Sequence, residues 1–213
     1  MAQKRRRLNL LRIITEVIAL VLVIVLTANH KLQIWLLLFA LGVITSLFAG
    51  RLFCGWICPM NTIFRAINLI YGKLKIKRFT APRFLKNSIV RYGFLALFVI
   101  SMIVVKAAGL HIDMLLYIIL FSVILTLSVN EEFWHRYACP FGTVLHISAR
   151  RSRFGLHIDE NACISCGKCQ KVCPSLSIET AENKKRRNLN HECLLCTQCQ
   201  DVCPTDACQL INK

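Results

Sequence analysis

The stretch Cys163-Ile164-Ser165-Cys166-Gly167-Lys168-Cys169-Gln170-Lys171-Val172-Cys173-Pro174 decides the fold of the C-terminal part of this chain. The same spacing returns 30 residues later, in Cys193-Leu194-Leu195-Cys196-Thr197-Gln198-Cys199-Gln200-Asp201-Val202-Cys203-Pro204. Each run offers three cysteines on a tight loop and a fourth directly before proline, which is the spacing that ligates two [4Fe–4S] clusters. The repeated run therefore predicts a small iron–sulfur module with two clusters.

Each cluster is predicted to take three thiolates from one run and one from the other. Three thiolates on one loop cap a face of the cubane, and the cysteine before proline reaches across to the second cluster. A pair of structural zinc sites is the alternative, but zinc does not need four cysteines in this register. Cys208 lies outside both runs, and we expect a buried thiol packed near a cluster. The predicted ligands are Cys163, Cys166, Cys169 and Cys203 for cluster one, and Cys193, Cys196, Cys199 and Cys173 for cluster two.

The composition of the 213 residues excludes an ordinary soluble enzyme and a disulfide-bonded secreted domain. Hydrophobic residues make up 55% of the chain, and most of the 12 cysteines fall in Cys-x-x-Cys runs, which favour metal ligation in a reducing compartment. Residues 1–153 hold 20 Lys and Arg against 4 Asp and Glu, whereas residues 154–213 hold 7 of each kind. Excess positive charge around apolar segments is typical of membrane flanks, so we expect a membrane as partner and no nucleic acid.

Four apolar stretches precede the iron–sulfur module, and each is long enough, with its flanks, to cross about 30 Å of hydrocarbon. Short connections after the first and the third predict two antiparallel helical hairpins. Residues 1–12 carry five Lys and Arg and residues 50–88 carry eight, against only Lys31 and Lys106 on the opposite side. The positive-inside rule therefore places both termini and the module in the cytoplasm, at the inner membrane. A secretory or twin-arginine signal is the alternative, but no small-x-small cleavage site follows the first apolar stretch. The stretches are Ile13–Ala28, Ile34–Ala49, Ser88–Ala108 and Ile112–Val129.

An internal repeat with a period of 81 residues relates the two hairpins. Cys58-Pro59 aligns with Cys139-Pro140, and the same offset superimposes the first apolar stretch on the third and the second on the fourth. The predicted fold class is an α-helical membrane protein, with four transmembrane helices as two repeated hairpins (about 8–72 and 89–153) and a small α+β two-cluster ferredoxin domain. The predicted domains are residues 1–153 and 154–213, joined by a basic run that suits anionic head groups.

Two motifs, Cys54-x-x-x-Cys58-Pro59 and His135-x-x-x-Cys139-Pro140, come just after the second and the fourth apolar stretch. Residues four apart share a helical face and proline then redirects the chain, so each motif can offer both side chains to one point. If the repeats pack about a common axis, all four side chains converge at the boundary between membrane and cytoplasm. A Cys3His set suits an iron–sulfur cluster, copper or zinc. The alternative is four separate structural residues. We name this candidate the membrane-edge site: Cys54, Cys58, His135 and Cys139.

Three further side chains are candidates for handling protons or a quinone. His30 and His111 lie at the outer ends of the two hairpins and are related by the repeat, and imidazole titrates near neutral pH. Glu16 is a carboxylate within the first apolar helix, where charge is costly. The alternatives are histidines that are solvated or bound to head groups, and an i,i+4 ion pair between Arg12 and Glu16.

With these motifs the chain resembles the four-helix polyferredoxin family typified by the NapH-type quinol dehydrogenase subunit of periplasmic nitrate reduction. Relatives of that family include the NosR-type regulators and the CcoG/RdxA-type oxidase assembly proteins. The family's second motif normally begins with cysteine, and here that position is His135. The resemblance covers nearly the whole chain and is carried by both cysteine runs, by Arg51-Leu52-Phe53-Cys54-Gly55-Trp56-Ile57-Cys58-Pro59 and by Arg136-Tyr137-Ala138-Cys139-Pro140-Phe141-Gly142.

The resemblance implies an electron-transfer subunit of a quinol dehydrogenase-type complex. Such a subunit holds two [4Fe–4S] clusters and passes electrons between the quinone pool and the iron–sulfur or cytochrome subunits of an anaerobic respiratory chain, usually serving an extracytoplasmic reductase. Two alternatives remain open. One is a metal-handling assembly factor for a respiratory enzyme, which binds copper through Cys54, Cys58 and Cys139, because thiolates favour Cu(I). The other is a redox sensor without turnover.

Overall fold

The computed structural model describes residues 2–29, 31–109 and 113–212. Within these ranges the chain forms mostly helices, with four short strands near the C-terminus. The helices are α1 (Ala2–Ala28), α2 (Gln33–Ala49), α3 (Leu52–Trp56), α4 (Pro59–Leu74), η1 (Arg83–Leu85), α5 (Ser88–Ala107), α6 (Met114–Ser128), α7 (Glu131–Phe133), η2 (Trp134–Ala138), α8 (Pro140–Ser148), η3 (Ala149–Arg151), α9 (Lys168–Lys171) and α10 (Gln198–Val202). The strands are β1 (Phe154–Ile158), β2 (Ile178–Thr180), β3 (Arg186–Asn188) and β4 (Cys208–Asn212).

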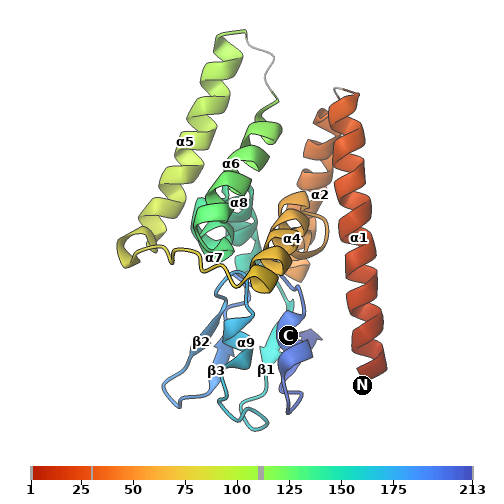
Figure 1. Ribbon diagram of the computed structural model, residues 1–213, viewed down its shortest axis with the longest axis vertical. Coiled ribbons are helices and arrows are strands. Elements are labelled where there is room, and N and C mark those ends of the chain that lie inside the picture. Colours follow the sequence, from red (N-terminus) through yellow and green to blue (C-terminus); the bar gives the residue numbers. More distant parts are fainter. Residues whose placement is uncertain (1, 30, 110–112, 213) are drawn as a thin grey trace.

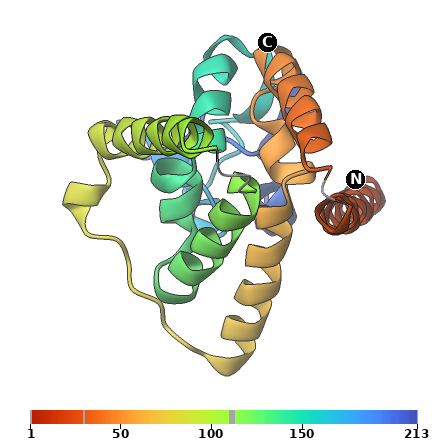
Figure 2. The ribbon, with the colours of Figure 1, turned by 90° about the horizontal axis from the view of Figure 1, so that it is seen from above.

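The molecule has two ends with different chemistry. Helices α1, α2, α5 and α6 extend toward one end, and the part with the four strands lies at the other end, beside the N-terminal end of α1 (Figure 1). The short helices between them form a middle layer. Seen from above, α1 and α5 stand on opposite sides, and the loop between α4 and α5 runs around the outside (Figure 2). The N-terminus of α1 and the cysteine runs therefore share one end of the molecule.

Two of the long helices, Arg7–Ala28 within α1 and Ser88–Ala107, are long and apolar enough to cross a membrane. Helices α2 and α6 are apolar but shorter, with 17 and 15 residues. Helix α1 is longer than the predicted apolar stretch: it begins at Ala2 and includes the basic residues before Ile13. Lysine and arginine are good helix formers, so the end of an apolar stretch does not have to be the end of its helix.

Proline fixes the start of two helices in the middle layer. Pro59 is the first residue of α4 and Pro140 is the first residue of α8, and in each case the preceding cysteine has an extended backbone. Proline suits this position because its nitrogen has no hydrogen to donate and its fixed φ fits the first helical turn. Each motif of the membrane-edge site therefore runs through one short helical segment and ends where the next helix begins.

The C-terminal part is built from two similar halves. Strand β1 pairs with β4 and β2 pairs with β3, both antiparallel. Left-handed backbone recurs at the spacing of the cysteine runs: Ser165 and Leu195, Gly167 and Thr197, and Leu176 and Asp206 all have φ between 52° and 72°. Such residues are uncommon outside glycine, and here they curl each run into the same tight loop. The sequence repeat is thus also a repeat of backbone conformation.

Candidate metal centres

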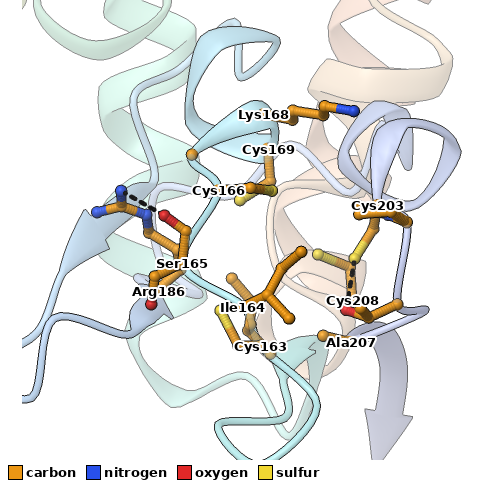
Figure 3. A pocket seen from close by; sticks show the side chains of 14 residues that line it. Cys163, Ile164, Ser165, Cys166, Lys168, Cys169, Arg186, Cys203, Ala207 and Cys208 are labelled. Atoms are coloured by element: carbon orange, nitrogen blue, oxygen red, sulfur yellow. Dashed lines mark hydrogen bonds between the residues drawn. The ribbon is translucent and has the colours of Figure 1, made fainter.

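A cavity lies where the first cysteine run meets the end of the second. Figure 3 shows Cys163, Cys166 and Cys169 on one side of this space and Cys203 on the other. Cys163 and Cys169 are buried, Cys203 is half-buried, and Cys166 is exposed. The structure therefore brings together the four cysteines predicted for cluster one, and it leaves that site open to solvent near Cys166.

A second cavity is lined by the other set of predicted ligands. All four of its cysteines are buried. Burial raises the pKa of Cys193 to about 11 and that of Cys196 to about 12, so these thiols are neutral without a bound cation. Binding a metal centre must displace the proton of each thiol, as metal binding to cysteine generally does. The lining cysteines are Cys173, Cys193, Cys196 and Cys199.

Cys208 lines the first cavity. Its side chain is 1% exposed and interacts with the thiols of Cys169, from the first set, and Cys199, from the second. Figure 3 shows it close to Cys203. It is the first residue of β4. Its burial matches the expectation of a buried thiol at this position.

The membrane-edge site is assembled from α3, η2 and the starts of α4 and α8. Cys54, His135 and Cys139 are 5%, 4% and 7% exposed, and Cys58 is half-buried. Cys58 packs against the apolar cluster that contains Cys54 and also against the cluster that contains Cys139. Side chains from both halves of the predicted repeat therefore lie together in the middle layer. No three of their ligand atoms, however, lie within 4.8 Å of one another among the described residues.

The imidazole of His135 is held without a hydrogen bond at Nε2. Its ring packs edge-on against Phe64, with 5.4 Å between the ring centroids, and Nε2 is a buried atom with no partner in the described part of the chain. Burial, together with the nearby charge of Arg51, lowers the pKa of His135 to about 3. The ring is therefore neutral at physiological pH, as a metal ligand has to be. His135 lies in the π-helical turn η2, and such turns are frequent at functional sites.

Sequence reasoning missed a buried ionic network next to the membrane-edge site. Glu192, directly before Cys193, accepts two hydrogen bonds of 2.8 Å from Arg91 and one of 3.3 Å from Arg51. Arg136 Nε lies 3.8 Å from the same carboxylate, and His146 Nδ1 lies 3.3 Å from it. Burial alone would raise the pKa of Glu192, but these contacts outweigh burial and hold that pKa well below its ordinary value. The only available signal was proximity in sequence, since Arg51 and Glu192 each stand next to a cysteine motif.

Arg51 links this network to the membrane-edge site. Its side chain is fully buried, and Nη2 donates to the backbone oxygen of His135 at 2.9 Å and lies 3.9 Å from Cys54 Sγ. The same nitrogen passes over Gly142, where an added Cβ would lie 2.5 Å from it. One guanidinium from the first motif therefore contacts residues of both motifs and a carboxylate of the C-terminal part.

The C-terminal part is also docked directly on the first motif. An added Cβ at Gly55 would lie 2.1 Å from the backbone oxygen of Leu194, and Trp56 Nε1 donates to the backbone oxygen of Leu195 at 3.0 Å. Helix α3 therefore packs against the loop between Cys193 and Cys196. The predicted tether is not the main connection, because Leu194 and Glu192 are buried against the helices.

His146, His191 and Glu192 are the one group of three side chains in the described ranges whose ligand atoms all lie within 4.8 Å of one another. Both oxygens of the carboxylate are already bound by Arg91. Neighbouring guanidiniums repel a metal cation, so this group is a part of the ionic network and not a second metal site.

Of the three candidates for proton handling, the structure describes only Glu16. Glu16 is 2% exposed, and its carboxylate pairs with Arg12 at 3.4 Å and with Arg65 at 3.2 Å, while Asn61 donates to it at 3.2 Å. This is the predicted i,i+4 pair, extended by two residues of α4. His30 and His111 lie outside the described residues.

Comparisons with known proteins identify the same segments. A family model described as a 4Fe-4S binding domain matches residues 32–77 and again residues 111–158. A second, described as a 4Fe-4S dicluster domain, matches residues 155–204. The chain is 26% identical to the ferredoxin-type protein NapH of Haemophilus influenzae, over 62% of this chain and 50% of NapH. The chain therefore resembles the NapH-type ferredoxin-type proteins. These matches confirm the resemblance read from the motifs.

Two further relatives are a ferredoxin-type protein and an uncharacterized protein. This chain is 25% identical to the methylamine utilization ferredoxin-type protein MauN of Methylobacillus flagellatus, over 60% of this chain and 50% of MauN. It is 31% identical to the uncharacterized protein MJ0749 of Methanocaldococcus jannaschii, over 63% of this chain and 55% of that protein. The chain thus spans about half the length of the curated relatives it matches. Together these findings show a chain that contains [4Fe–4S] binding domains and is similar to ferredoxin-type proteins.

Proposed function

We propose that this protein is a membrane-bound electron carrier that links the quinone pool to a redox partner, as a quinol dehydrogenase-type subunit. The observation that carries the proposal is the pair of cysteine-lined cavities at one end of a set of apolar helices. The donors fit the cofactor, because the first cavity offers its four predicted ligands together with Cys208, the second offers four thiols, and neither is lined by a carboxylate or an imidazole. When bound, [4Fe–4S] clusters supply one-electron transfer.

The proposed cluster ligands are assigned from the cysteines that line each cavity. In each, three cysteines of one loop face the cysteine before proline of the other run, which is the exchange expected for two clusters. Cluster one is assigned to Cys163, Cys166, Cys169 and Cys203, and cluster two to Cys193, Cys196, Cys199 and Cys173.

We propose that α1, α2, α5 and α6 all cross the membrane, as two repeated hairpins. Helices α2 and α6 rise only about 26 Å and 23 Å, at about 1.5 Å per residue, so they need flanking residues or a thinner bilayer to span about 30 Å. Many large apolar side chains on these helices are exposed, which suits contact with lipid. The charge count places both termini and residues 154–213 in the cytoplasm, at the inner membrane.

A quinone is the proposed carrier across the membrane because the predicted cluster ligands all lie at one end of the molecule. The C-terminal part and the middle layer share the end opposite the tips of the four long helices (Figure 1). A hydrocarbon layer of about 30 Å separates that end from the other side. A lipid-soluble carrier, or an iron–sulfur or cytochrome subunit of a partner complex, has to complete any route across.

The copper-handling alternative has less support. Metal–sulfur bonds of about 2.3 Å place the thiolates of a mononuclear site roughly 4 Å apart. The described residues of the membrane-edge site have no three ligand atoms within 4.8 Å of one another. Their arrangement therefore favours a centre with several metal ions.

The proposal is tested by adding quinol to the anaerobically purified full chain in liposomes and following the clusters by electron paramagnetic resonance. We expect quinol to reduce the clusters and quinone to reoxidise them. The matched control is Cys208→Ala, which leaves the assigned ligands in place. A preparation with intact clusters that do not respond to either compound would rule out the quinone link.

A further inference from the structure

Two features of the membrane-edge site are not explained by the two ferredoxin clusters. Three cysteines and one histidine from distant parts of the sequence are gathered in the middle layer, and none of them lines either cavity. His135 is 4% exposed, and its Nε2 has no partner among the described residues. A buried polar atom without a hydrogen bond costs free energy, and a metal bound to His135 Nε2 would remove this cost.

The charges around the site point to an anionic ligand. Within the buried part of the network, Arg51 and Arg91 face one carboxylate, that of Glu192. The third guanidinium, of Arg136, is shared with the half-exposed Glu179. One positive charge therefore remains without an anion. Arg91 is held by both oxygens of Glu192, so the uncompensated charge is closest to Arg51 and thus to Cys54, 3.9 Å from Arg51 Nη2. A buried charge without a counter-charge is costly.

The spacing of the ligand atoms decides between one metal ion and several. The cysteines of the two ferredoxin cavities also contain no three sulfur atoms within 4.8 Å of one another. In a cubane each thiolate binds a different iron, so its ligands stand further apart than those of one tetrahedral ion. The membrane-edge site likewise has no three ligand atoms within 4.8 Å of one another, which suits a centre of several metal ions better than a single ion.

The site also lies next to the loop of cluster two. Cys54 belongs to the same buried apolar cluster as Leu194 and Cys196, and Gly55 leaves no room for a side chain against Leu194. A metal centre on Cys54 would thus be separated from the cluster-two loop only by packed backbone.

From these observations we propose that Cys54, Cys58 and Cys139, as thiolates, and His135, through Nε2, bind a third iron–sulfur centre, with Arg51 as its fixed counter-charge. On binding, each of the three thiols exchanges its S–H bond for an iron–sulfur bond and releases one proton to solvent, while the neutral imidazole loses nothing. Iron and sulfide come from cellular cluster assembly. The inference extends the proposed function but does not need quinone to be the carrier.

The first test counts iron and acid-labile sulfide in the anaerobically purified full chain. Two cubanes give about eight irons, so we expect about 10 or 12 per chain, depending on the type of the third centre. Cys58→Ser should return the count to about eight, whereas the control Cys208→Ser, which changes a thiol outside the three proposed sets of ligands, should leave it unchanged. About eight irons in both the unaltered chain and Cys58→Ser would overturn the inference. So would one copper or zinc ion lost with Cys58→Ser.

The first test also separates this inference from the proposed function. Eight irons that still respond to quinol would leave the quinone-linked function standing without a third centre. Ten or 12 irons that ignore quinol would support the third centre and reject the quinone link.

The second test uses spectroscopy to examine His135. Replacing imidazole by thiolate lowers the potential of a cluster, as the comparison of Rieske centres with all-cysteine clusters shows. His135→Cys should therefore keep the iron count and shift the midpoint potential of the third centre downward, with a changed paramagnetic resonance signal. The two ferredoxin signals should not move. An unchanged third signal would show that His135 is not a ligand.

The third test examines Arg51 as a positioning residue. A positive charge near an anionic centre favours its reduced form, so Arg51→Gln should lower the midpoint potential of the third centre. Arg51→Lys keeps the charge but cannot contact both Glu192 and His135, and it should lower the potential less. Arg187→Gln, on exposed β3, is the control. Equal potentials in the unaltered chain and both Arg51 variants would reject the role of its charge.

Discussion

At the scale of single residues, Glu192 holds two buried positive charges beside the cysteine motifs. It is 3% exposed and is bound by guanidiniums from α5 and from the turn before α3. A glutamate in a polar loop is usually solvated, so its place in the sequence does not indicate this role. The spacing of the cysteine runs, by contrast, groups the two sets of four ligands, because ligand geometry constrains where each thiol lies in sequence.

Removing the charge of Glu192 should therefore destabilise the protein strongly. Glu192→Gln leaves two buried guanidiniums without their carboxylate, and breaking a buried ion pair costs about 3–5 kcal/mol. The free energy of unfolding in detergent, from denaturant titration, measures this loss. Glu179→Gln is the control, because the Arg136–Glu179 pair is half-exposed and such pairs contribute about 0–1 kcal/mol. Similar small losses in both variants would contradict the role given to the buried network.

Gly55 is a second residue whose role only the fold reveals. In Gly55→Ala the new Cβ would overlap the backbone oxygen of Leu194, so α3 and the cluster-two loop must separate, at a cost of about 1–3 kcal/mol. Gly72→Ala, also within a helix, meets nothing within 4 Å and should stabilise by about 0.5–1 kcal/mol. A lower midpoint of thermal unfolding for Gly55→Ala and a higher one for Gly72→Ala would support the close packing of α3 against the cluster-two loop. A stable Gly55→Ala variant would contradict it.

The exchange of ligands between the runs gives a further prediction for single residues. Cys173 lies four residues after Cys169 in sequence, but it lines the other cavity. Cys173→Ser should therefore weaken the cluster bound by the second loop and leave the cluster of the first loop intact. Cys203→Ser should do the reverse. Paramagnetic resonance of the two reduced signals distinguishes these outcomes, and loss of the same signal in both variants would rule out the exchange.

At the scale of secondary structure, the sequence predicts where apolar segments lie better than where helices end. The predicted stretches at Ser88 and Ile34 begin within one residue of α5 and α2. Helix α1, by contrast, begins at Ala2, because helix formation does not depend on hydrophobicity. The middle layer was not predicted at all beyond its cysteine–proline motifs, since short helices such as α3 and α7 depend on tertiary packing more than on propensity.

The proposed crossing of α5 is tested by reporter fusions. A fluorescent protein, which matures only in the cytoplasm, and alkaline phosphatase, which is active only outside it, are fused in turn after Lys75 and after Gly109. We expect fluorescence at the first position and phosphatase activity at the second. Fluorescence at both positions would show that α5 does not cross the membrane, despite its length and apolar composition.

At the scale of the whole molecule, the C-terminal part contacts the helices directly. The sequence predicts two domains joined by a basic run, because composition changes near residue 153. The structure adds contacts across this boundary: Leu194 is 1% exposed in the same apolar cluster as Cys54, and Asn9 in α1 donates to Asp201 at 2.6 Å. These contacts join segments that are far apart in sequence, so composition and spacing could not reveal them.

This packing predicts that the two clusters differ in how much they depend on the helices. Cluster two's loop is covered by α3, whereas the cavity of cluster one is open to solvent near Cys166 in the intact molecule. Expressed alone, residues 154–213 would expose Leu194 and would leave Glu192 without its guanidinium partners. In this fragment we therefore expect cluster two to be lost faster in air than cluster one. In the full chain the exposed cluster one should be lost first, and visible absorption with paramagnetic resonance during air exposure measures both rates. The same order of loss in fragment and full chain would mean that the helices do not protect cluster two.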